Sequence, residues 1–148
     1  MEPVVIYVDA DACPVKEHIF RVAKRYSLKV IVVSNTAIFL PRADWILPVV
    51  VTKDFDAVDN WIESKVQPRD IVVTNDILLA ARVLKKEARA IDPRGKIFTQ
   101  DNIGESVATR ELLSELRQRG ELGLGPKKMG KKHSSHFLSA LDELINSK

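Results

Sequence analysis

Two aspartates stand one residue apart, directly after an apolar stretch near the N-terminus. Asp9 and Asp11 follow the run Val4–Val8 in the sequence VDADACPV. Side chains two positions apart project to the same side of an extended chain, so the two carboxylates share a face if the strand continues. Such carboxylates can bind a divalent cation, serve as nucleophile and acid in a phosphatase, or cap the next helix. The spacing leaves these roles open, together with a reactive thiol at Cys13.

More acids follow two later apolar runs. Asp76 stands just after Ile71–Val73 in IVVTND, and Asp56 and Asp59 follow WILPVVV in TKDFDAVDN. Acids crowded in one crevice raise each other's pKa, and a bound cation offsets that repulsion. Mg²⁺ and Mn²⁺ prefer oxygen ligands and also bind phosphate oxygens. The sequence therefore predicts a Mg²⁺ or Mn²⁺ site whose catalytic acids are Asp9, Asp11 and Asp76, with Asp56 and Asp59 as further ligands.

Each acid also has a structural alternative. An aspartate after a strand often caps the following helix by accepting hydrogen bonds from its first N–H groups. Asp11 before Pro14, Asp56 and Asp76 all stand at such positions. Capping is the simpler interpretation for one acid alone, whereas a shared site explains Asp9, Asp11 and Asp76 together.

The elements that must position these acids follow from the hydrophobic pattern. Short apolar runs predict strands at 4–8, 28–33, 45–51 and 71–73, with shorter ones at 88–91 and 97–99. Helical spacing predicts helices at 14–26, 57–66, 78–84, about 102–119 and 134–145. Strands that alternate with helices predict a mostly parallel central sheet in a three-layer α/β/α fold. Pro48 places the third strand at an edge or a bulge, and Trp45 and Trp61 are expected in the core.

The polar residues that follow these strands are expected at one rim of the sheet. Sites in open parallel sheets form beyond the carboxyl ends of the strands, where the winding direction reverses. Lysines also gather in a segment without acids between Glu121 and Asp142. Both groups either contact a phosphate substrate or simply turn the chain and stay solvated. We expect substrate contacts from Ser34, Asn35, Thr74, Asn75, Lys127 and Lys128.

Bulk properties limit the class of protein. The 148 residues fit a single domain over 1–148, with 45% hydrophobic and 29% charged residues. One cysteine excludes an internal disulfide and a zinc site built on several thiolates. There is no apolar run of the ~20 residues that cross a bilayer, and the N-terminus has no basic signal region, so we expect a cytoplasmic protein without membrane contact. A net charge of +3 is compatible with a polyanionic partner.

Several motifs together resemble one family. VDADACPVK, DAVDNWI, IVVTNDILLAARVL, DPRGKIFTQDNI, GPKK and FLSALDELI are similar to the YaiI/YqxD family, also called UPF0178 or DUF188, bacterial proteins grouped with PIN-like nuclease folds. The resemblance implies a single PIN-like domain with an acidic, metal-binding, RNase-like centre, and pairing into a homodimer by analogy. Asp9 matches the first acid, Asp76 the acid after the central strand, and Asp56 or Asp59 the intermediate one. Where the family usually carries an aspartate before its last helix, MGKKHSSHF has His133.

The functional expectation is a divalent-metal-dependent nuclease, with RNA favoured over other phosphate-containing substrates. One alternative is a haloacid-dehalogenase-like phosphatase with Asp9 as nucleophile, Asp11 as acid/base and Ser34 after the second strand. Against it, a helix that begins at Pro14 leaves no room for the usual flap, and IVVTND lacks the expected Gly-Asp pair. Another alternative is a non-catalytic nucleic-acid-binding protein. Cys13 is expected to serve packing.

Overall fold

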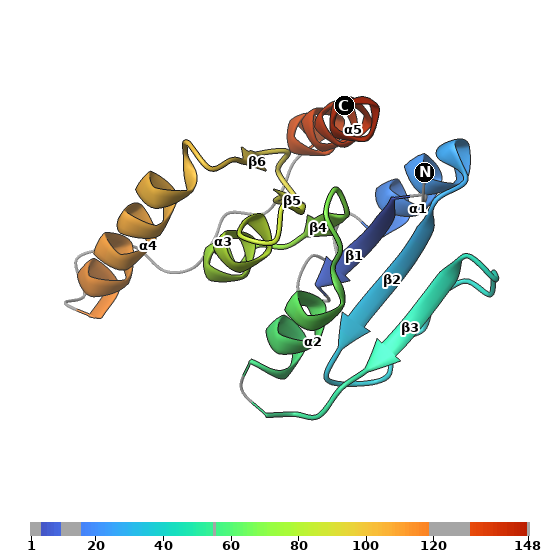
Figure 1. Ribbon diagram of the computed structural model, residues 1–148, viewed down its shortest axis with the longest axis horizontal. Coiled ribbons are helices and arrows are strands. Elements are labelled where there is room, and N and C mark those ends of the chain that lie inside the picture. Colours follow the sequence, from blue (N-terminus) through green and yellow to red (C-terminus); the bar gives the residue numbers. More distant parts are fainter. Residues whose placement is uncertain (1–3, 10–15, 55, 119–130, 148) are drawn as a thin grey trace.

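A six-stranded sheet forms the centre of the molecule. The structure is a computed structural model that describes residues 4–9, 16–54, 56–118 and 131–147, without the side chains of 117–118 and 131–134 (Figure 1). The spatial strand order is β3-β2-β1-β4-β5-β6, and all neighbours are parallel except the antiparallel pair β5 and β6. The strands are β1 (Val5–Asp9), β2 (Lys29–Ser34), β3 (Ile46–Val50), β4 (Ile71–Val73), β5 (Arg89–Ile91) and β6 (Ile97–Phe98).

Helices cover both faces of this sheet. They are α1 (Lys16–Tyr26), α2 (Ala57–Lys65), α3 (Ile77–Leu84), α4 (Ile103–Gln118) and α5 (Lys131–Asn146). Buried residues of α1 and α5 pack on one face, and those of α2 and α3 pack on the other (Figure 1). The predicted three-layer α/β/α fold is confirmed.

Alternation along β1 decides which layer Asp9 faces. Ile6 and Val8 pack into the core under α1 and α5, whereas Tyr7 belongs to the core under α2 and α3. The Tyr7 ring lies 6.2 Å from the Trp61 ring, and its hydroxyl donates to the carbonyl of Lys65. Asp9 is two residues beyond Tyr7, so its side chain projects toward the same layer.

The winding direction of the sheet reverses between β1 and β4. From β1 the chain adds β2 and β3 on one side, then crosses back to place β4 and β5 on the other. Tyr7 pairs with Val72 and Val8 with Val73, so the next step along both strands places Asp9 beside Thr74. This is the arrangement in which a ligand site is expected.

Several local predictions can be compared with the structure. β3 is an edge strand, as Pro48 indicated. Trp45 and Trp61 are half-buried against the core, with Trp45 at 6.3 Å from the Phe20 ring. The last helix begins at Lys131 and not at Ser134, because lysine and serine also continue a helix. Among the described residues, no helix is long and apolar enough to cross a membrane. Pro14, where the first helix was expected to begin, lies outside the described residues.

A buried aspartate ties the start of β1 to the turn before β4. Asp70 is 5% exposed, and its carboxylate accepts hydrogen bonds from the backbone N–H of Val5 (3.1 Å) and of Gln67 (2.9 Å). These two bonds help to hold β1 and β4 in register.

We predict that Asp70→Ala lowers the free energy of unfolding by about 1–3 kcal/mol, because it leaves two N–H donors without their acceptor. Chemical denaturation measures the change. Asp44→Ala is the matched control, because Asp44 is exposed. Equal stability of the two variants would contradict the role given to Asp70.

Candidate acidic active site

The hydroxyl of Thr74 joins two of the predicted acids. Thr74 follows β4 and is fully buried. Its Oγ1 donates to Oδ2 of Asp9 (2.9 Å) and accepts from the backbone N–H of Asp76 (2.9 Å). Asp9 is itself 5% exposed. One side chain therefore fixes the acid at the end of β1 relative to the acid at the start of α3.

Asp76 caps α3 and also belongs to the acidic site. Its Oδ1 accepts hydrogen bonds from the N–H groups of Leu78 (2.9 Å) and Leu79 (3.3 Å). The capping alternative is thus confirmed for this residue. Asp76 also lines the acidic cavity beside Asp59 and raises the pKa of that residue, so the two roles coexist.

Asp59 is the acid with the strongest electrostatic perturbation. It lies in the first turn of α2 and is half-buried. Burial, the hydrogen bond to Asp76, and then the charges of Asp76, Asp9 and Asp56 raise the pKa of Asp59 from 3.8 to about 7. A carboxyl group with this pKa still holds a proton in a large fraction of molecules at neutral pH. The raised pKa of Asp59 is therefore a consequence of the acids that surround it.

Asp56 does not cap α2, contrary to the capping alternative. It occupies the N-cap position, but its backbone is left-handed (φ 68°, ψ 5°) and its side chain makes no capping hydrogen bond. Aspartate tolerates this conformation better than most residues. The exposed carboxylate faces the same cavity as Asp59.

A cavity of about 360 Å³ contains these acids. Asp54 was not among the predicted ligands, and the sequence had no local signal for Lys53 or for Arg110, which comes from the distant helix α4. Asp54 accepts a hydrogen bond from the Thr52 hydroxyl (2.9 Å). The described charged residues that line the cavity are Asp9, Asp54, Asp56, Asp59, Asp76, Lys53 and Arg110.

The donor chemistry fits a hard divalent cation, but the described residues do not form a complete ligand set. Carboxylate oxygens are the ligands that Mg²⁺ and Mn²⁺ prefer. Among the residues that the structure describes, no group of three or more His, Cys, Asp or Glu side chains is arranged to hold a metal ion. Asp11, which we predicted as a ligand, lies outside the described residues.

The residues predicted to contact the substrate do not all lie at the acidic cavity. The Ser34 hydroxyl donates to the carbonyl of Thr36 and helps to turn the chain after β2. Asn35 Nδ2 donates to the carbonyl of Thr52 (2.9 Å) and so ties this turn to the segment after β3. Asn35 also lines the acidic cavity, whereas Asn75 is exposed and lines a neighbouring one. Cys13, Lys127, Lys128 and the side chain of His133 lie outside the described part of the chain.

We predict that Thr74→Val lowers the free energy of unfolding by about 1–3 kcal/mol, since the Asp9 carboxylate loses a donor and the Asp76 N–H loses its acceptor in a buried place. Thr74→Ser keeps the hydroxyl and is the matched control. Denaturant unfolding compares the two. A valine variant as stable as the serine variant would contradict the role given to the Thr74 hydroxyl.

The raised pKa of Asp59 gives a pH-dependent prediction. A carboxyl whose pKa is higher in the folded state favours folding while protonated, so this contribution is lost as pH rises from 3.8 toward about 7. Asp59→Asn has no charge to bury. Its melting temperature relative to the native protein should therefore rise between about pH 5 and about pH 8 in metal-free buffer. A difference that stays constant with pH would contradict the electrostatic account.

Known proteins match almost the whole chain. The description "Uncharacterized BCR, YaiI/YqxD family", the family DUF188, matches residues 7–147. A UPF0178 protein of Azorhizobium caulinodans is 50% identical over 144 residues, which cover 97% of this chain and 91% of the relative. A UPF0178 protein of Brucella ovis is 49% identical over 145 residues, covering 97% and 90%. No solved structure matches. The chain therefore belongs to the YaiI/YqxD family, whose curated relatives carry the name UPF0178.

Proposed function

We propose that this protein is a divalent-metal-dependent nuclease that hydrolyses phosphodiester bonds, with single-stranded RNA as its preferred substrate. The observation that carries the proposal is the meeting of Asp9, Asp59 and Asp76 at the reversal point of the sheet, in a cavity open to solvent. Strongly perturbed carboxylates in a cleft are typical of functional sites. The choice of RNA follows from the family resemblance and the net charge of +3.

The proposed ligands of Mg²⁺ or Mn²⁺ are Asp9 and Asp76, together with Asp11, Asp56 and Asp59. When bound, the cation supplies positive charge for the phosphate oxygens and lowers the pKa of water. Asp59 must lose its proton to serve as a ligand, so binding releases a proton near neutral pH. The affinity for the cation should accordingly increase as pH rises through about 7.

A few residues around the acids position the carboxylates and the substrate. Thr74 orients the Asp9 carboxylate from the buried side of the site. The N-terminus of α3 stabilises the negative charge of Asp76 through two N–H groups. Lys53 and Arg110 line the cavity and can each contact a phosphate oxygen of the substrate.

We predict that the purified protein with Mn²⁺ cleaves a fluorescent single-stranded RNA, and that Asp9→Asn and Asp76→Asn each lower the rate by about a hundredfold or more. Asparagine at position 76 still caps α3, so the fold is kept while the charge is removed. Asp44→Asn removes an exposed carboxylate outside the cavity lining and is the matched control. Circular dichroism verifies that all variants are folded.

Other outcomes would favour a different function. Turnover of a phosphomonoester with a trapped aspartyl-phosphate at Asp9 would indicate the phosphatase. RNA binding that depends on salt but not on metal, without cleavage, would indicate a binding module. Absence of Mg²⁺ and Mn²⁺ binding in calorimetry at millimolar concentration would contradict the metal-dependent nuclease itself.

A further inference from the structure

We propose that a second cavity, next to the acidic one, binds one nucleoside monophosphate unit of the substrate strand. This proposal rests on the proposed nuclease function for the identity of the strand. The cavity lies between the start of α3, the loop before β6 and one face of α4, and its volume is about 430 Å³. That volume falls within the range of roughly 300–1,000 Å³ that is usual for small-molecule sites.

The two cavities are adjacent because they share a wall. Arg110 of α4 lines both of them. Asn75 lines the second cavity, and the next residue, Asp76, lines the acidic one. A ligand that occupies both cavities must therefore be elongated and must pass Arg110 where they meet.

The second cavity carries its own positive charge. Lys96 and Arg110 are its described cations and Glu105 is its described acid. Lys96 Nζ donates to the hydroxyl of Ser106 (3.0 Å), which is 5% exposed, and lies 5.6 Å from the centre of the Phe98 ring. This ammonium group is thus held in place before any ligand arrives, which reduces the entropy lost on binding an anion.

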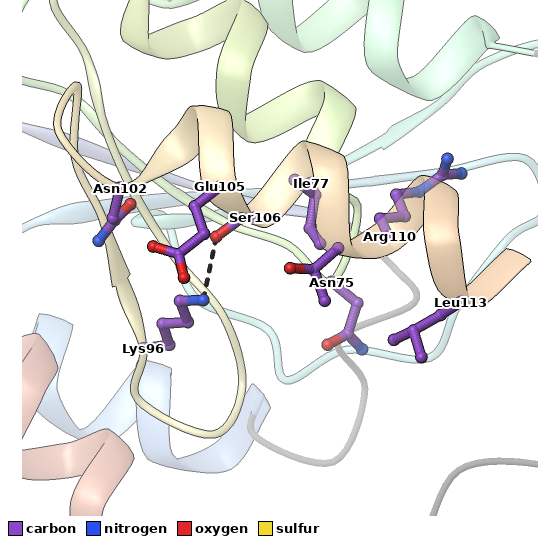
Figure 2. A pocket seen from close by; sticks show the side chains of 9 residues that line it. Asn75, Ile77, Lys96, Asn102, Glu105, Ser106, Arg110 and Leu113 are labelled. Atoms are coloured by element: carbon purple, nitrogen blue, oxygen red, sulfur yellow. Dashed lines mark hydrogen bonds between the residues drawn. The ribbon is translucent and has the colours of Figure 1, made fainter.

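Figure 2 shows how the lining is arranged. Lys96 and Asn102 lie at one end of the cavity, and Arg110 and Leu113 lie at the other, with Ser106 between them. No hydrogen bond or ion pair links the guanidinium of Arg110 to another described residue. A phosphate at the junction of the cavities can therefore accept hydrogen bonds from the N–H groups of Arg110.

Polar and apolar contacts suited to a nucleoside occur in the same space. Ile77 and Leu113 supply apolar surface for a ribose or a base face. The Asn102 amide is already engaged, since its Oδ1 accepts from Thr99 N–H and its Nδ2 donates to the carbonyl of Ile97. Asn75 is exposed, and its side-chain amide has no hydrogen-bond partner among the described residues. Asn75 is accordingly the residue that we expect to contact the base edge.

A nucleotide explains this combination better than an isolated anion does. An inorganic phosphate would use Arg110 but neither the apolar wall nor Asn75. A nucleoside monophosphate would place its phosphate near Arg110 and its ribose and base along Ile77 and Leu113. The next phosphate of the strand would then lie toward Asp76 and the acidic cavity.

The test is an NMR titration of ¹⁵N-labelled protein with 5′-AMP in buffer containing EDTA, so that neither metal nor cleavage is needed. Amide shifts should gather at Asn75, Ser106 and Arg110, and AMP should bind more tightly than inorganic phosphate or adenosine. Arg110→Gln should weaken AMP binding by about tenfold. Thr109→Trp, which fills the cavity from an exposed position of α4, should also weaken it. The matched control is Arg21→Gln, an exposed arginine on α1 across the sheet.

Two results would overturn the nucleotide site. The first is AMP binding no tighter than inorganic phosphate, and the second is equal AMP binding by the native protein, Arg110→Gln and Thr109→Trp. Other results distinguish a failure of the nucleotide site from a failure of the proposed nuclease function. AMP binding at this cavity without RNA cleavage would support the nucleotide site against the nuclease, whereas metal-dependent cleavage that Thr109→Trp leaves unchanged would support the nuclease against the site.

Discussion

The buried hydroxyl of Thr74 is the contact on which the arrangement of the acids depends. It donates to Asp9 at the end of β1 and accepts from the N–H of Asp76 at the start of α3. This is possible only because β1 and β4 are neighbours in parallel register and because alternation turns Asp9 toward the α2 and α3 layer. A shift of one residue in that register would point Asp9 into the opposite core.

The acids are gathered at an electrostatic cost that the surrounding structure only partly offsets. Asp76 gains two N–H donors at the N-terminus of α3, and Asp9 gains the hydroxyl of Thr74. Burial and the neighbouring acids raise the pKa of Asp59 to about 7, so this carboxyl still holds its proton in a large fraction of molecules at neutral pH. A cation bound among these acids would offset the same repulsion.

Most of the fold could be predicted from the sequence because buried parallel strands are continuous apolar runs. The neighbourhood of Asp9 and Asp76 followed from the rule for the reversal point of such sheets. The local backbone of Asp56 could not be foreseen, because its left-handed conformation depends on how the chain enters α2. Arg110 and Lys96 were missed for another reason. They lie on exposed surfaces, and the sequence does not show which exposed surface borders a cavity.

The turn between β4 and α3 concentrates these constraints in three consecutive residues. Thr74 points inward and holds the acids, Asn75 faces the second cavity, and Asp76 faces the acidic cavity. In an extended strand such residues could face only two sides, so the chain must leave the strand at Thr74 for all three to be used. The cap at Asp76 makes that departure possible, because α3 can begin at once. The charge of the two cavities differs as well. Aspartates outnumber Lys53 and Arg110 in the lining of the acidic cavity, whereas Lys96 and Arg110 stand against the single acid Glu105 in the second one.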